Sequence, residues 1–75
     1  MEIEQAFGRV LKELRKDAKL SQENLALETD LDRTYISLLE RGLRQPTLKT
    51  IFKLSKALQI TPSQFLLKIE DILTT

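Results

Sequence analysis

The sequence has no cysteine and no histidine among its 75 residues. Without cysteine there is no disulfide and no thiolate metal site. Without histidine, the commonest acid–base group and the commonest metal ligand are both missing. The chain also contains no glycine-rich phosphate loop and no acidic cluster at metal-ligand spacing. We therefore expect a protein that is not an enzyme and that uses no metal and no other cofactor.

Long apolar runs are absent as well. No stretch approaches the roughly 20 apolar residues that a membrane-spanning helix needs, and the N-terminus lacks the layout of a signal peptide. These absences predict a cytoplasmic protein without a membrane partner. A length of 75 residues predicts one small domain, 1–75, whose core is marginal unless it is well packed or supplemented by association.

The net charge of +1 is unevenly distributed along the chain. Residues 1–32 carry five basic and eight acidic side chains, whereas residues 33–68 carry seven basic side chains and a single acid, Glu40. Residues 69–75 add two further acids. The basic segment is where a phosphate-facing surface is expected. For Lys53, Lys56 and Lys68 a simple solvated face explains the charge equally well.

Apolar residues recur at helical spacing in five segments, which predicts an all-α chain. The expected helices are residues 3–19, 22–29, 33–41, 48–58 and 62–73. The last four follow residues suited to the N-cap position, namely Ser21, Asp32, Thr47 and Thr61.

The stretch 21–41 predicts two short helices joined by a tight turn. Each has a capping residue flanked by an apolar pair at the spacing of a hydrophobic staple. Asp30, in the turn, tolerates a left-handed backbone better than most residues, and Gly42 supplies a left-handed stop after the second helix. This is the outline of a helix-turn-helix, whose second helix can enter the DNA major groove.

The outward face of that second helix offers polar groups near its N-terminus. Arg33 can pair with guanine O6 and N7, and Thr34 and Ser37 can bond phosphates or base edges. The inward face needs Ile36 and Leu39.

The motifs LSQENLA, DRTYISLLERG and RQPTLKTIFKLSKAL resemble the lambda repressor and Cro (XRE-like) helix-turn-helix family over roughly residues 5–66. Within that family, the short chain with DRTYIS followed by ERG is most similar to the small controller proteins of restriction–modification systems. The resemblance implies a compact five-helix, lambda-repressor-like DNA-binding domain.

The resemblance and the helix geometry together assign candidate site residues. The base-reading group is Arg33, Thr34, Ser37 and Leu38. The group facing the DNA backbone is Gln22, Tyr35, Arg44, Gln45, Lys49 and Thr50. The family pattern also implies a structural ion pair between Arg15 and Glu40, with a surface pair of little value as the alternative.

The expected helix 62–73 carries six large apolar residues in nine positions. We interpret it as a dimer surface formed by Phe65, Leu66, Ile69 and Leu73, because so small a domain has little core to cover them. One stripe, which includes Phe65, Ile69 and Ile72, can instead pack on the domain. The alternative is that the whole set is core or an apolar tail.

The function predicted from these features is a sequence-specific transcriptional regulator that binds double-stranded DNA as a homodimer. Its operator would be pseudo-palindromic, with half-sites about 34–36 Å apart. No small-molecule ligand is expected, and the resemblance to controller proteins implies an autoregulating circuit with either activation or repression. The alternative is an antitoxin or another protein-binding module of the same fold.

Overall fold

The computed structural model describes residues 1–75 and contains five α-helices and no strand, as the sequence predicts. None of the helices is long and apolar enough to cross a membrane. The helices are α1 (Ile3–Asp17), α2 (Gln22–Thr29), α3 (Arg33–Glu40), α4 (Leu48–Ala57) and α5 (Pro62–Thr74).

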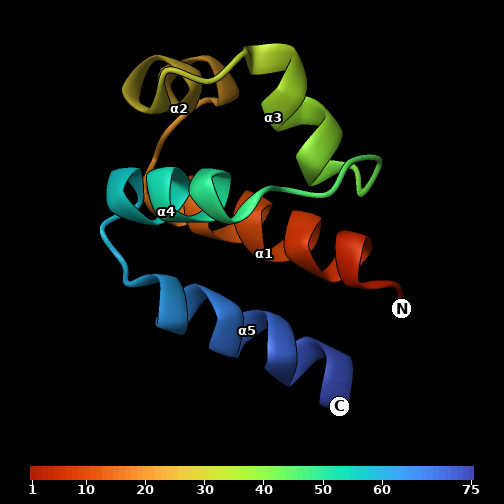
Figure 1. The fold of residues 1–75 in the computed structure, drawn as a ribbon. Helices are drawn as coiled ribbons and strands as arrows, with labels where there is room; N and C mark the ends of the chain where they lie inside the picture. The colour runs from red at the N-terminus through yellow and green to blue at the C-terminus, as the bar shows by residue number, and fades with distance from the viewer.

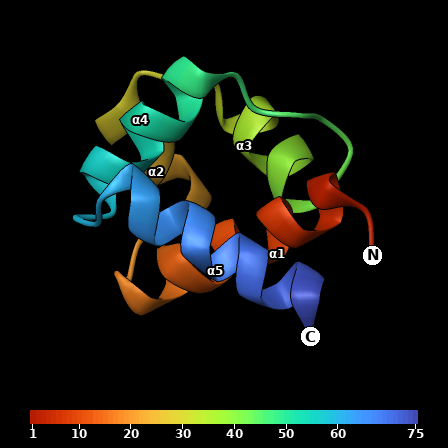
Figure 2. The same cartoon turned by 60° about the horizontal axis from the view of Figure 1, so that its bottom comes forward.

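The helices α1 and α4 form the middle of the molecule (Figure 1). The pair α2 and α3 lies on one side of them, and α5 lies on the other side. The turned view shows α5 running along α1, which it contacts together with α4 (Figure 2). Since α3 and α5 occupy opposite sides, a surface on α5 stays clear of anything that α3 binds.

The core consists of twelve buried apolar side chains drawn from all five helices. At its centre the rings of Phe7 and Phe65 stack with their centroids 5.1 Å apart. Burial of apolar area is the main force that holds such helices together. The twelve residues are Ala6, Phe7, Val10, Leu11, Leu25, Ala26, Ile36, Leu39, Leu54, Leu58, Phe65 and Ile69.

Four helices begin at the predicted caps. The side chain of Ser21 accepts a hydrogen bond from the amide of Asn24 at 3.0 Å, and that of Asp32 accepts one from Thr34 at 3.0 Å. Thr47 and Thr61 cap α4 and α5 in the same way, each binding an amide at 3.1 Å. These bonds satisfy amides that lack a helical partner, so short polar side chains decide where each helix starts.

The helix ends are decided by residues with a left-handed backbone. Asp30 and Gly42 take this conformation as predicted, with φ of 59° and 74°. The predicted helix 3–19 is too long, because Lys19 is also left-handed, with φ of 60°, and the chain leaves the helix after Asp17. Gln59 ends α4 in the same manner, which the sequence analysis did not anticipate. At the other C-termini the predicted and observed ends differ by no more than one residue.

Candidate nucleic-acid interface

The N-terminal half of α3 carries its polar side chains outward. Arg33 and Thr34 are exposed, and Ser37 and Leu38 are half-buried. The opposite face of the helix packs into the core. The four residues expected to read bases therefore lie on the face of α3 that is turned away from the core.

Behind this face, Arg15 on α1 and Glu40 at the end of α3 form an ion pair. The guanidinium donates from Nε to Glu40 Oε2 at 2.6 Å and from Nη2 to Oε1 at 3.1 Å. The two side chains are only 11% and 3% exposed. The hydrogen bonds and charge of Glu40 raise the pKa of Arg15, although burial lowers it. The pair therefore has the geometry of a buried structural link between α1 and α3.

Two more groups join this pair. Arg15 donates from Nη1 to the carbonyl of Leu20 at 2.8 Å, before α2 begins. The amide of Gln22 donates to Glu40 Oε1 at 3.1 Å. Gln22, which we expected to contact a phosphate, is thus held against α3 by its own side chain. The network ties α1, α2 and α3 together, so the two helices of the motif keep a fixed relative orientation.

A glycine makes the close contact between α1 and α3 possible. A Cβ on Gly8 would meet the backbone carbonyl oxygens of Leu39 and Glu40, the latter at 2.6 Å. No carbon atom fits at that distance from a backbone oxygen. Gly8 is therefore required for the close packing of α1 against α3.

The start of α4 is joined to α3 through hydroxyl groups. Thr47 Oγ1 lies 2.9 Å from Thr50 Oγ1, and Tyr35 OH lies 3.4 Å from the same Thr50 atom. Thr50 is 6% exposed. Its expected contact with a DNA phosphate is therefore wrong, because the side chain is buried and its hydroxyl lies between those of Thr47 and Tyr35.

The loop between α3 and α4 and the first turn of α4 are accessible. Arg44, Gln45 and Lys49 are exposed, in keeping with their expected place beside a DNA backbone. The guanidinium of Arg44 lies over the ring of Tyr35, 5.6 Å from its centroid. Tyr35 itself is half-buried, with its ring partly in the core. Positive charge thus borders α3 on the side where α4 begins.

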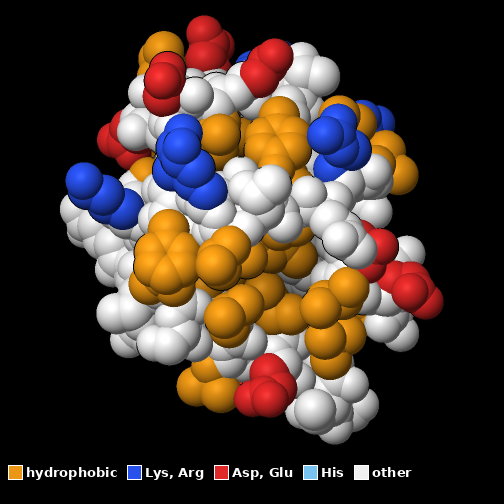
Figure 3. Space-filling model, viewed as in Figure 1, with side chains coloured by type: hydrophobic (Ala, Val, Ile, Leu, Met, Phe, Trp, Pro, Cys, Tyr) orange, Lys and Arg blue, Asp and Glu red, His pale blue; other side chains and the backbone are white.

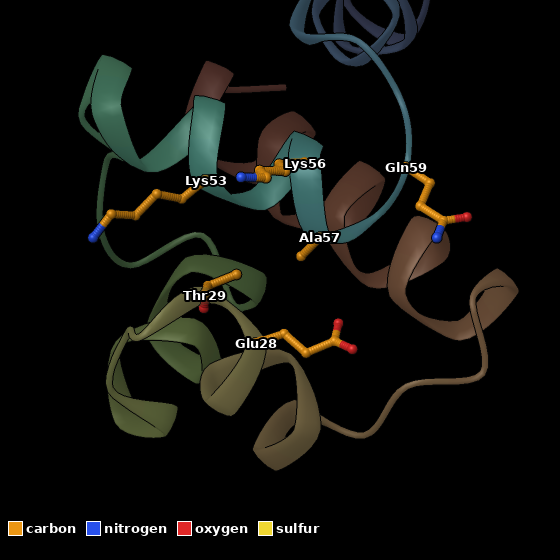
Figure 4. Close-up of a pocket in the computed structure, with 6 residues that line it drawn as sticks. All are labelled: Glu28, Thr29, Lys53, Lys56, Ala57 and Gln59. Carbon is orange, nitrogen blue, oxygen red and sulfur yellow. The ribbon is translucent and has the colours of Figure 1, made fainter.

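The other two lysines of α4, Lys53 and Lys56, share one depression with Lys49 and also extend toward α2. Lys53 and Lys56 line an open hollow of about 500 Å³ between α2 and α4, together with Glu28 of α2 (Figure 4). The figure shows the Lys53 amino group and the Glu28 carboxylate pointing to opposite ends of the hollow. The lysines make no ion pair there, which is typical of a solvated surface.

An apolar hollow of about 210 Å³ lies where α5 meets α1 and α4. Its apolar walls are Ile3, Phe7, Pro46, Ile51, Leu66 and Ile69. Figure 3 shows hydrophobic side chains gathered over the middle and lower part of this face, with lysine and arginine side chains above them. The sequence does not predict this hollow, because Ile3 and Pro46 come together to form its walls only when the chain folds.

The predicted dimer surface on α5 is only partly accessible. Leu66 and Leu73 are 47% and 39% exposed, as expected for an outer face. Phe65 is 0% exposed and stacks on Phe7, so its assignment to the dimer surface is wrong. Ile69 is also buried and reaches the surface only as a wall of the hollow. The physical reason is that Phe65 points inward and stacks on Phe7 of α1 within the core.

Comparison with known proteins identifies the fold and the family. Residues 11–65 match the helix-turn-helix family model. The chain is 48% identical to control protein C.BamHI of Bacillus amyloliquefaciens over 61 residues, covering 80% of this chain and 75% of that protein. It is 46% identical to control protein C.MunI of Mycoplasma sp over 70 residues, covering 92% and 95%.

One solved structure is similar to this chain both in sequence and in the arrangement of its helices. The restriction–modification controller protein C.AhdI from Aeromonas hydrophila superposes with a TM-score of 0.80 at 45% identity, covering 83% of this chain and 94% of that one. Residues 11–65, which the family model matches, contain the exposed face of α3 and the network behind it. The chain belongs to the helix-turn-helix family of DNA-binding transcriptional regulators.

Proposed function

We propose that this protein is a homodimeric controller that binds a pseudo-palindromic operator and regulates a restriction–modification operon that includes its own gene. The proposal rests on one observation: the polar face of α3 is exposed, and the buried Arg15–Glu40 pair behind it holds the helix in place. The relatives named as controller proteins support the choice of regulated operon.

In this proposal α3 lies in the major groove. Arg33 reads a guanine through its two-pronged guanidinium, while Thr34 and Ser37 bond neighbouring bases or phosphates. Leu38 supplies an apolar contact, for which a thymine methyl is the natural partner. Arg44 and Lys49 contact phosphates on the side where α4 begins, since both are exposed cations, one in the loop after α3 and the other in the first turn of α4.

The dimer forms through the apolar face that contains the 210 Å³ hollow. Leu66, beside the hollow, and Phe52, which lines a neighbouring depression with Ile60 and Pro62, are both about half exposed. Exposed apolar surface of this kind on a small domain is typical of an association site. A twofold dimer through this face leaves α3 of each chain free to enter its own half-site.

The experiment that tests this function is selection of bound duplexes from a random DNA pool at moderate salt, followed by native mass measurement of the complex. We expect an enriched pseudo-palindromic sequence that carries two protein chains. The half-site centres should lie about one helical turn, 34–36 Å, apart. Binding without an enriched sequence would contradict base reading by α3, and one chain per selected site would contradict the dimer.

A further inference from the structure

Arg44 is an exposed cation on a loop, yet its guanidinium has a defined place. It lies 5.6 Å from the centroid of the Tyr35 ring, within the roughly 6 Å over which a cation is attracted to an aromatic face. No carboxylate lies within ion-pair distance of Arg44. The Tyr35 ring is therefore the group that orients this side chain.

The ring of Tyr35 is itself held at two points. One edge packs against the core, and its hydroxyl lies 3.4 Å from Thr50 Oγ1. The Thr50 hydroxyl in turn lies 2.9 Å from Thr47 Oγ1, and Thr47 caps α4. A chain of contacts thus runs from the N-terminus of α4, through α3, to the guanidinium of Arg44.

We infer that Tyr35 is a positioning residue that presents Arg44 to a DNA phosphate, with the packing of the Tyr35 ring against the core fixing its orientation. The inference rests on the proposed DNA-binding function and extends it to the loop after α3. Because Tyr35 belongs to the same helix as Arg33 and Thr34, seating that helix in a groove also places Arg44. An arginine that is already oriented loses less side-chain freedom on binding than one on a free loop.

The first test uses the free protein and needs no DNA. Protons of the Arg44 side chain should show an upfield ring-current shift in the NMR spectrum of the wild type. The shift should persist in Tyr35→Phe, which keeps the ring, and disappear in Tyr35→Leu, which removes it. Arg44 protons at ordinary random-coil shifts in the wild type would overturn the inference.

The second test measures coupling on the duplex selected by the wild-type chain. Arg44→Ala should weaken binding about fivefold in the wild type but less than about twofold in a Tyr35→Leu background, because in that background Arg44 is no longer oriented. Lys49→Ala is the matched control and should have an equal effect in both backgrounds, since no hydrogen bond or cation–π contact joins Lys49 to Tyr35. Equal effects of Arg44→Ala in both backgrounds would overturn the inference while leaving the proposed function intact.

A third test, the affinity of Tyr35→Phe, separates positioning from direct contact and does not depend on the stability of Tyr35→Leu. Tyr35→Phe keeps the ring under Arg44 and should change affinity by less than about twofold. A loss of about tenfold would mean that the hydroxyl itself binds DNA, which would overturn the positioning role. Binding of the wild type to its selected duplex reports separately on the proposed function.

Discussion

Removing the Glu40 carboxylate should destabilise the whole fold. In Glu40→Ala, the guanidinium of Arg15 loses bonds of 2.6 and 3.1 Å and keeps only the one to the carbonyl of Leu20. Gln22 loses its acceptor at the same time. Because the Arg15 side chain is only 11% exposed, water cannot replace these partners without a rearrangement of α1 and α3.

The expected cost follows from this burial. Breaking a buried pair by removing one partner costs roughly 3–5 kcal/mol. A domain of this length has a free energy of unfolding of about 4–11 kcal/mol in total. Glu40→Ala should therefore remove about a quarter or more of the stability and lower the melting temperature by about 12 °C or more.

The measurement is urea unfolding followed by circular dichroism at one fixed protein concentration. Glu13→Ala is the matched control, because the Arg9–Glu13 pair spans 3.6 Å with side chains 59% and 62% exposed. Its loss should cost about 0.5 kcal/mol or less. If Glu40→Ala proved as mild as Glu13→Ala, the view that Glu40 holds α1 to α3 would be refuted.

Other substitutions test packing, DNA contact, association and pH dependence. Gly8→Ala should destabilise by at least about 2 kcal/mol in urea unfolding, since its Cβ would collide with α3 carbonyls; wild-type stability would show that α3 moves freely. Arg33→Ala should cost about 1–3 kcal/mol in binding the selected duplex and relax preference at one base position, whereas equal weakening on all sequences would indicate a phosphate contact. Leu66→Glu should give monomers in sedimentation and Leu67→Glu should not, because only Leu66 lines the hollow; a persistent Leu66→Glu dimer would place the interface elsewhere. Since Glu40 raises the pKa of Arg15, stability from the charged guanidinium is lost only as pH rises through that raised pKa. Urea unfolding from about pH 7 to 10 should therefore show no loss assignable to Arg15.

The five helices could be predicted because their signals are local. Ser21, Asp32, Thr47 and Thr61 each bind an amide two or three residues ahead, so the start of each helix is encoded within one turn. The end of α1 could not be placed in the same way. Lysine has no special preference for the left-handed backbone, and Lys19 takes it as the chain turns toward α2.

The outward face of α3 was also predictable, because burial of the apolar stripe of a helix leaves only the opposite face exposed to solvent. The site residues that we misplaced depend on other helices. Thr50 looks like a polar residue in an exposed first turn, but it is buried and its hydroxyl meets that of Tyr35 from α3. Phe65 looks like part of an apolar outer face, but it stacks on Phe7 of α1.

The sequence by itself determined the helix starts, the two-helix motif and the family resemblance, since these depend on residues within a turn or two of one another. The tertiary structure decided which polar groups stay available for DNA and which are used inside the protein. Glu40 shows the reason. Its partner Arg15 lies 25 residues away, and only the packing of α1 against α3 brings the two charges to 2.6 Å and excludes water from them.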